Sequence, residues 1–444
     1  MADATGKRAF FMHNGGVLVE GQKTTNPPTV SDIEDAAKRI ADCVITSPLH
    51  ISERLSDLTG ATVYLKREDL QPVRSYKIRG AFNFLLQLDA KEREHGVVCA
   101  SAGNHAQGFA RACNTLGVEG RIFVPKTTPR QKIDRIRHFG GDRITITVAG
   151  STYDDASELA KKHAATSGAL VVSAFDDPRT IAGQGTISAE ITDQLGFAPD
   201  TVVVPVGGGG LLAGMAEYCH HRTPDTRVIG VEPAGAACMT AALATGAPVQ
   251  LDTVDSFADG AAVRRAGDLT YAMVRDLGLP ITTVDEGRVA KEMVDLYQVD
   301  GIIAEPAGAI SPASVGPADS DVPVAVEAGS TVVCVISGGN NDLSRYSEVL
   351  ERALVWEGLQ HYFIVNFPQE PGALRRFLDN VLGPDDDVSM FEYVKRSDRE
   401  IGPAFVGITL GRAQDLTGLL ERMDESPLEI ERVSQDSPLF RMFV

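Results

Sequence analysis

The chain has 444 residues, of which 43% are hydrophobic and 23% are charged, and its formal net charge is −18. A length of this order suggests about two to four structural units and is sufficient to bury a large core. The excess of acidic residues argues against binding to nucleic acid or to an anionic membrane surface, because both need clustered basic residues.

The six cysteines are scattered along the chain and form no C-x-x-C pair, which indicates a reducing compartment. No apolar run reaches the length of about 18 residues that a membrane span needs. Polar residues after Met12 interrupt the short apolar run near the N-terminus, so no signal-peptide core develops. We therefore expect a cytoplasmic protein in which residues 1–28 form a flexible leader.

The first expected element is a helix near Ser31, which has capping-box spacing with Glu34. β-rich runs then alternate with helical stretches, which is typical of mostly parallel sheets covered by helices on both faces. Ligands in such proteins bind where strands end and loops enter helices. The expected strands are Thr62–Leu65, Val97–Ala100, Arg121–Val124, Ile144–Val148, Leu170–Ser173, Thr201–Val206, Val228–Val231, Ile281–Val284 and Thr331–Ile336.

The pattern changes near residue 355, after a loop-like stretch over 312–327 and an expected helix over Asn341–Val355. The order becomes strand, helix, strand, strand, helix, strand, which is the split β-α-β or ferredoxin-like arrangement. The expected bounds are Gln360–Val365, Gly372–Val381, Ser389–Lys395, Pro403–Leu410, Ala413–Met423 and Glu429–Val433. We predict a large α/β domain over 29–355 and a small α+β domain over 356–444.

Lys77 is the first candidate functional residue. It follows Ser75 and Tyr76 where a loop enters a predicted helix, and Gly80 allows close packing there. Most lysines are solvated surface charges. An amine beside a helix start and other cations, however, loses its proton more easily, as a Schiff-base lysine requires.

A second motif, Ser101 to Gly108, directly follows an expected strand. Its small residues leave backbone N–H groups free at a helix start, which predicts a carboxylate-binding site. Asn104 can donate an amide N–H to a ligand oxygen. We expect a structural role for His105, because no group that could orient its ring is evident.

Four consecutive glycines form the third motif. A loop without side chains at a helix N-terminus lets backbone N–H groups surround a phosphate dianion, and a simple tight turn is the alternative. No lysine follows the loop, which argues against a nucleoside triphosphate. The residues are Gly207, Gly208, Gly209, Gly210 and Leu211.

Ser337 precedes Gly338 and Gly339 at the end of an expected strand. Its hydroxyl could point into the cleft or could cap the next helix. No metal site is predicted, because the nine histidines lack ligand spacing, and His220 and His221 point to different faces of a helix.

Together the four motifs resemble those of the fold-type II family of pyridoxal-phosphate (PLP) enzymes. The signatures S-[YF]-K-x-R-G-A, S-x-G-N-H-x-Q-G, G-G-G-G-L and S-G-G-N occur in the family's order over about residues 30–350. The resemblance implies mostly parallel sheets in two subdomains, with PLP as cofactor. It further implies that Lys77 holds PLP as a Schiff base, Asn104 bonds the ring 3-oxygen, residues 207–211 bind the phosphate and Ser337 meets the pyridine nitrogen.

Within this family the chain most resembles the biosynthetic threonine ammonia-lyases. Phe257–Val263 looks like their F-A-D-G-x-A-V segment and Ala304–Ala309 like their A-E-P-x-G-A segment. Phe367–Leu374 looks like the start of an ACT-like regulatory domain. Arg74 departs from the pattern, because relatives usually have an aromatic or small residue there.

The resemblance implies β-elimination of L-threonine, and also of L-serine, at the first step of isoleucine biosynthesis. Lys77 would remove the α-proton, and Ser101 with the backbone of Gly103 and Asn104 would hold the substrate carboxylate. Ser337 would leave the ring nitrogen largely unprotonated, which suits a carbanion that promptly expels its β-hydroxyl.

A single ACT-like domain implies inhibition by isoleucine, binding of valine as is often found in this family, and assembly into a homodimer or homotetramer. Four aromatic residues beside the Glu370–Gly372 turn could line the effector pocket. Alternatively, they are only the core of the small domain. They are Phe363, Phe391, Tyr393 and Phe405.

Three alternatives differ in activity or class. A serine racemase needs a second acid–base group, which is a serine at the position of Ala102. The methyl group of Ala102 cannot transfer a proton, which argues against racemisation. A catabolic dehydratase would lack feedback inhibition by isoleucine, and the presence of the C-terminal domain argues against this alternative. An amino-acid sensor with an inactive PLP domain is disfavoured by the intact Lys77, Asn104 and glycine loop.

Overall fold

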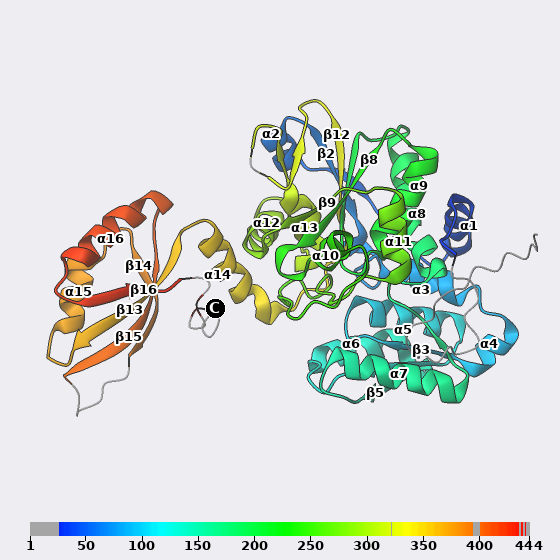
Figure 1. Cartoon of the computed structure of the whole chain (residues 1–444), viewed down its shortest axis with the longest axis horizontal. Helices are drawn as coiled ribbons and strands as arrows, with labels where there is room; N and C mark the ends of the chain where they lie inside the picture. Colours follow the sequence, from blue (N-terminus) through cyan, green and yellow to red (C-terminus); the bar gives the residue numbers. More distant parts are fainter. Residues whose placement is uncertain (1–25, 321, 394–399, 435–436, 438–439, 441–444) are drawn as a thin grey trace, which may run out of the picture.

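A computed structural model (Figure 1) describes residues 26–320, 322–393, 400–434, 437 and 440. Most of the expected leader and Lys395, the last residue of one expected strand, lie outside the described residues. No helix in the described part of the chain is long and apolar enough to cross a membrane.

A large lobe is built on a six-stranded sheet with strand order β1-β2-β12-β7-β8-β9. All neighbouring strands are parallel except β1 and β2. Helices cover both faces, so the central strands are apolar and buried on both sides (Figure 1). The strands are β1 (Leu49–Ile51), β2 (Thr62–Arg67), β7 (Thr201–Pro205), β8 (Arg227–Pro233), β9 (Ile281–Val284) and β12 (Thr331–Ile336).

A smaller lobe has a four-stranded parallel sheet with strand order β5-β4-β3-β6. Its strands are β3 (Val97–Ala100), β4 (Gly120–Val124), β5 (Ile144–Val148) and β6 (Leu170–Val171). Its helices are α4 (Ala90–His95), α5 (Asn104–Leu116), α6 (Arg130–Gly140) and α7 (Tyr153–Ser167).

The remaining helices before residue 315 pack around the large sheet or between the lobes (Figure 1). They are α1 (Val30–Ile40), α2 (Glu53–Thr59), α3 (Lys77–Leu85), α8 (Pro178–Leu195), α9 (Gly210–Arg222), α10 (Cys238–Thr245), α11 (Asp268–Asp276), α12 (Glu286–Gln298) and α13 (Pro306–Ser314).

A buried ionic network anchors helix α3. The Arg79 guanidinium lies 2.7 Å from Glu68 Oε1 and 2.6 Å from Glu190 Oε1, and Lys66 Nζ lies 2.7 Å from Glu190 Oε2. Removing one partner from a buried ion pair leaves an uncompensated charge, which is strongly destabilising. The network therefore holds α3 against β2 and α8, and Lys77 is the first residue of α3.

Helix α14 (Tyr346–Trp356) leads from the large lobe to the C-terminal domain (Figure 1). That domain has an antiparallel sheet with order β14-β15-β13-β16, and α15 and α16 cover one face. This is the expected split β-α-β arrangement. Its elements are β13 (Gln360–Pro368), α15 (Ala373–Val381), β14 (Asp387–Tyr393), β15 (Ile401–Thr409), α16 (Leu416–Glu425) and β16 (Glu429–Arg432).

The cap of α1 differs from the predicted one. Thr29, not Ser31, has the extended backbone of a cap, and its hydroxyl accepts from the Asp32 N–H at 3.3 Å. The Asp32 carboxylate in turn accepts from the Thr29 N–H at 2.8 Å. Both pairs have capping-box spacing, and the Thr29 cap starts the helix at Val30, two residues earlier than a Ser31 cap would.

Three short strands and one helix start also differ from the sequence expectation. The strand β1 was not expected, and neither were β10 (Val315–Pro317) and β11 (Val324–Val326) within the stretch that looks loop-like. Residues Leu343–Arg345 form a separate 3-10 turn, capped by Asp342, before α14 begins. Strands of three residues are too short to show a hydrophobic period.

Candidate active site

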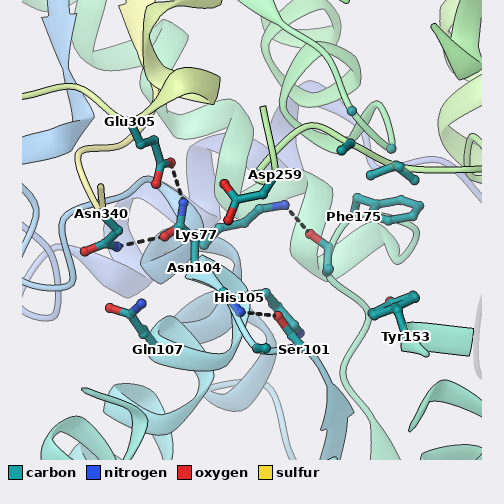
Figure 2. Close-up of a pocket in the computed structure, with 18 of the residues that line it drawn as sticks. Lys77, Ser101, Asn104, His105, Gln107, Tyr153, Phe175, Asp259, Glu305 and Asn340 are labelled. Carbon is teal, nitrogen blue, oxygen red and sulfur yellow. Dashed lines mark hydrogen bonds between the residues drawn. The ribbon is translucent and has the colours of Figure 1, made fainter. Parts of the chain in front are cut away.

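A cavity of about 910 Å³ is lined by residues of both lobes. The small lobe contributes the start of α5 and parts of α6 and α7, and the large lobe contributes the loop between β7 and α9. Most of the predicted site residues line this one cavity: Lys77, Ser101, Asn104, Gly207, Gly208, Gly209, Gly210 and Leu211 (Figure 2). Ser337 is the exception.

Lys77 presents its amine to the cavity from the first residue of α3. Its Nζ donates to the backbone carbonyl of Ala174 at 3.0 Å and lies 5.0 Å from the centre of the Tyr76 ring. No acidic side chain in the described part of the chain forms a salt bridge with this amine. A lysine without a counter-ion in a cavity is available to a ligand.

The glycine loop has the backbone geometry of an anion site. The Gly208 carbonyl accepts from the Thr270 hydroxyl at 2.6 Å, and the Gly209 carbonyl accepts from the Ala213 N–H at 2.9 Å. No hydrogen bond in the described residues uses the N–H groups of residues 207–211. These free donors at the start of α9 suit a phosphate.

Neighbouring segments explain why side chains are absent from this loop. A Cβ on Gly208 would overlap the Phe175 ring, and one on Gly210 would meet the Phe175 backbone at 2.8 Å. A Cβ on Gly207 would lie 3.0 Å from the Ala261 backbone, and Gly209 has a φ of +92°. Close packing against protein, as well as access for a ligand, thus requires glycine here.

The start of α5 forms the second anion-binding feature. The Gly103 N–H donates to Ser101 Oγ at 3.2 Å, and α5 begins at Asn104. The first N–H groups of a helix lack partners within the helix. Because Ser101, Ala102 and Asn104 line the cavity, these N–H groups lie beside it and can meet a ligand there.

The amide of Asn104 takes part in a network that joins three loops. Its Nδ2 donates to Glu305 Oε1 at 2.5 Å, and its Oδ1 accepts from Asn340 Nδ2 at 2.7 Å (Figure 2). Burial, with a further contribution from the Asp259 carboxylate, raises the pKa of Glu305 to about 7. Glu305 is not among the site residues predicted from the motifs, although it is the only acidic residue in the A-E-P-x-G-A segment.

His105 also lines the cavity but bonds to the backbone. Its Nε2 lies 2.9 Å from the Val172 carbonyl oxygen. Burial and the nearby Lys77 lower the pKa of His105 to about 4, so the ring is neutral at neutral pH. This arrangement fits the structural role that we expected.

Ser337 is buried and does not line the cavity. Its hydroxyl donates to the Ala307 carbonyl at 3.1 Å. A contact between Ser337 and a ring nitrogen would require this hydroxyl to rotate, so that role stays a prediction.

Several cavity-lining amides have polar atoms that no protein group satisfies. Gln107 Oε1, Asn340 Oδ1 and Asn341 Nδ2 are buried without a hydrogen-bond partner. Buried polar groups are normally paired, so these atoms indicate a polar ligand. With the Lys77 amine and the free N–H groups, the donor set fits a compact ligand that carries a phosphate, a ring oxygen and an aldehyde.

Within the described chain, no group of three or more acidic, histidine or cysteine side chains could hold a metal ion.

Helix α14 contacts a segment that reaches the cavity. Arg345 donates to the Phe257 carbonyl at 2.9 Å, and the Arg352 guanidinium lies 4.7 Å from the centre of the Phe257 ring. Asp259, two residues further on, lines the cavity and lies 2.6 Å from Lys132 Nζ on α6. The helix that leads to the C-terminal domain therefore contacts a segment that lines the cavity and that bonds to the small lobe through Asp259.

The four aromatic residues expected to line one effector pocket do not lie together. Phe363, Phe391 and Tyr393 belong to the cluster under α15 and α16, whereas Phe405 lies in the cluster on the opposite face of the sheet. That expectation is wrong because β13 and β15 pair Phe363 with Val406, so the adjacent Phe405 points to the opposite face of the sheet. On the helix-covered face, Gln369 has a buried amide without any hydrogen-bond partner.

Comparisons with known proteins agree with this geometry. The family described as "Pyridoxal-phosphate dependent enzyme" matches residues 40–338, and the "C-terminal regulatory domain of Threonine dehydratase" matches residues 351–443. The chain is 62% identical over 413 residues to the biosynthetic L-threonine dehydratase IlvA of Mycobacterium tuberculosis, which covers 93% of this chain and 95% of the relative.

Solved structures show the same fold. The processed form of threonine deaminase isoform 2 from Solanum lycopersicum has a TM-score of 0.67 and 38% identity, covering 76% of this chain and 99% of that one. Maize serine racemase has a TM-score of 0.66 and 30% identity, covering 74% and 99%. The chain therefore belongs to the family of PLP-dependent biosynthetic L-threonine dehydratases, with a fold-type II catalytic region and a C-terminal regulatory domain.

Proposed function

We propose that this protein converts L-threonine to 2-oxobutanoate and ammonia by β-elimination, acts also on L-serine, and is inhibited by isoleucine. The observation that carries the proposal is one cavity lined both by Lys77, whose amine has no counter-ion, and by unpaired backbone donors of two helix starts. The name and identity of the mycobacterial relative support threonine as substrate.

Each group at the cavity has a defined task in this proposal. The N–H groups of residues 207–211 would hold the cofactor phosphate, Asn104 would bond its ring oxygen, and Ser337 would face its ring nitrogen. When bound, the cofactor withdraws electrons from the substrate α-carbon and so makes its proton acidic. Lys77 Nζ accepts that proton, while Ser101 and the start of α5 hold the carboxylate.

The assay that tests the activity measures keto-acid formation from threonine and from serine. We expect turnover of both by the full chain, and loss of turnover and of the cofactor's visible absorbance in Lys77→Ala. Arg39→Ala, a substitution outside the cavity, serves as the matched control. Full activity of Lys77→Ala would overturn the assignment.

The proposed inhibition by isoleucine rests on the C-terminal domain. The ring cluster of Phe367, Phe377, Phe391 and Tyr393 has ring centres 5.5 to 6.3 Å apart. The unpaired amide of Gln369 lies beside Tyr393 and Gly402, on that face of the sheet. An apolar cluster next to an unsatisfied amide suits a small branched amino acid, and valine would meet the same groups.

Truncation before Gln360 tests where isoleucine acts. We expect the truncated enzyme to deaminate threonine without response to isoleucine, whereas the full chain is inhibited. A truncated enzyme that is still inhibited to the same degree would place the effector site in the catalytic region.

The proposed assembly is a homodimer or homotetramer, in the cytoplasm. Leu350 and Trp356 of α14, and Leu374 and Leu378 of α15, are between 39% and 47% exposed. Apolar surface of this kind favours contact with a second copy. Sedimentation analysis at micromolar concentration would contradict the proposal if it found only the 47.4 kDa chain.

A further inference from the structure

Glu305 is a buried carboxylate without an ion pair. Glu305 is only 4% exposed, and no cation in the described residues forms a salt bridge with its carboxylate. An unpaired carboxylate in the interior is costly unless hydrogen bonds compensate. Its position at the start of α13 does not explain that cost, because its side chain does not cap the helix.

Gly338 provides the space that the carboxylate occupies, and Gly260 is at contact distance from it. A Cβ on Gly338 would overlap Glu305 Oε1, and one on Gly260 would lie 3.5 Å from the same oxygen. Both glycines belong to segments that meet at the cavity from different parts of the large lobe. The absence of a side chain at Gly338 thus leaves room for the Glu305 carboxylate.

The carboxylate contacts Asn104 in an orientation that the network determines. The Val73 carbonyl can only accept, so the Asn340 atom 2.7 Å from it must be Nδ2. The same Nδ2 lies 2.7 Å from Asn104, so the Asn104 atom that it meets must be the acceptor Oδ1. Asn104 Nδ2 consequently faces Glu305, 2.5 Å from Oε1.

An amide nitrogen carries two N–H groups, and Glu305 accepts only one of them. Asn104 lines the cavity, so the second N–H remains for a ligand there. We propose that Glu305 is a positioning residue, which fixes the Asn104 amide so that its free N–H faces the ring oxygen of the cofactor. This inference rests on the proposed contact between Asn104 and the cofactor.

Losing Glu305 would allow the Asn104 amide to rotate. A buried hydrogen bond lost in this way typically weakens binding about tenfold. Because Glu305 itself lines the cavity, a positioning role requires that its effect on the cofactor pass through Asn104. This distinguishes a positioning role from a general role in stability.

The experiment measures PLP affinity by titration of the apo-protein, together with the absorption maximum of the bound cofactor. We expect Glu305→Ala to bind PLP about tenfold more weakly and to shift the absorption maximum in the same direction as Asn104→Ala. The double variant should bind no more weakly than Asn104→Ala alone. Glu305→Gln, which keeps an oxygen for Asn104 and nearly the same volume, should stay within about threefold of wild type.

Glu286→Ala is the matched control, because Glu286 is also a buried carboxylate that accepts a backbone N–H but does not line the cavity. It should leave affinity and spectrum unchanged. If Asn104→Ala alters the cofactor signals and Glu305→Ala does not, or if the two effects multiply in the double variant, the inference is wrong and the proposed function stands. If Asn104→Ala itself has no effect, the proposed role of Asn104 fails first, and the inference fails with it.

Discussion

We propose that Ala102 favours elimination over racemisation in this chain. It lines the cavity between Ser101 and Gly103, and maize serine racemase shares 30% identity with the chain. A methyl group cannot donate or accept a proton at the face of the substrate opposite Lys77. We therefore expect deamination of L-serine without D-serine, measured by chiral chromatography of reaction mixtures. D-serine formed as fast as pyruvate would contradict this interpretation.

The pKa of His105 gives a stability prediction. The ring titrates near 6.5 in an unfolded chain, and burial lowers this pKa to about 4 in the folded protein. Between these pH values the unfolded state binds a proton that the folded state does not. The free energy of unfolding therefore keeps its full value above pH 6.5 and falls as the pH drops toward 4. The loss is about 3 kcal/mol at most.

His105→Gln removes the titration but keeps an N–H donor that can reach the Val172 carbonyl, as Nε2 of the ring does. We expect the unfolding free energy of this variant, measured in urea between pH 7 and pH 4, to fall less than that of wild type. The raised pKa of Glu305 acts in the opposite direction in both proteins and cancels in the comparison. If the unfolding free energies of the variant and of wild type fell in parallel with pH, the titration of His105 would not contribute to the loss of stability.

At the scale of elements, the loop between β7 and α9 depends on the segment that carries Phe175. Gly208→Ala should weaken PLP binding about tenfold, because the new methyl group overlaps the Phe175 ring and overpacking displaces the loop. Adding Phe175→Leu should restore part of the affinity. Gly418→Ala on α16, where only the flexible end of Arg422 is near, should have no effect on PLP titration. An unchanged affinity in Gly208→Ala would mean that the loop tolerates side chains.

For the whole molecule, helix α14 provides a physical connection between the regulatory domain and the cavity. Arg352 lies against Phe257 and 3.2 Å from Asp255, and the same segment continues to Asp259 at the cavity. We expect Arg352→Ala to raise the isoleucine concentration needed for half-inhibition about tenfold, a typical size of coupling between sites. The KM for threonine without isoleucine should change little.

Inhibition curves for threonine deamination would measure this coupling in the full chain. Arg275→Ala, which removes an exposed ion pair with Asp276 on α11, is a suitable control. An unchanged response to isoleucine in Arg352→Ala would mean that the signal reaches the cavity by another route.

The sequence by itself determined the alternation of strands and helices, the change to an α+β domain, and the motif order that indicates the family. These features are local, since hydrophobic period, helix caps and glycine runs depend on neighbours within a few residues. It therefore also located Lys77, Ser101, Asn104 and the glycine loop at strand and helix ends, where the structure has them line one cavity.

Only the tertiary structure decided which distant residues meet. Glu305 contacts Asn104 from 201 positions away, and Phe175 packs on glycines that follow a different strand. The opposite faces of Phe363 and Phe405, and the exclusion of Ser337 from the cavity lining, likewise depend on register and lobe packing. Such contacts follow from the order of strands and the way two sheets dock, and no pattern within a single segment carries that information.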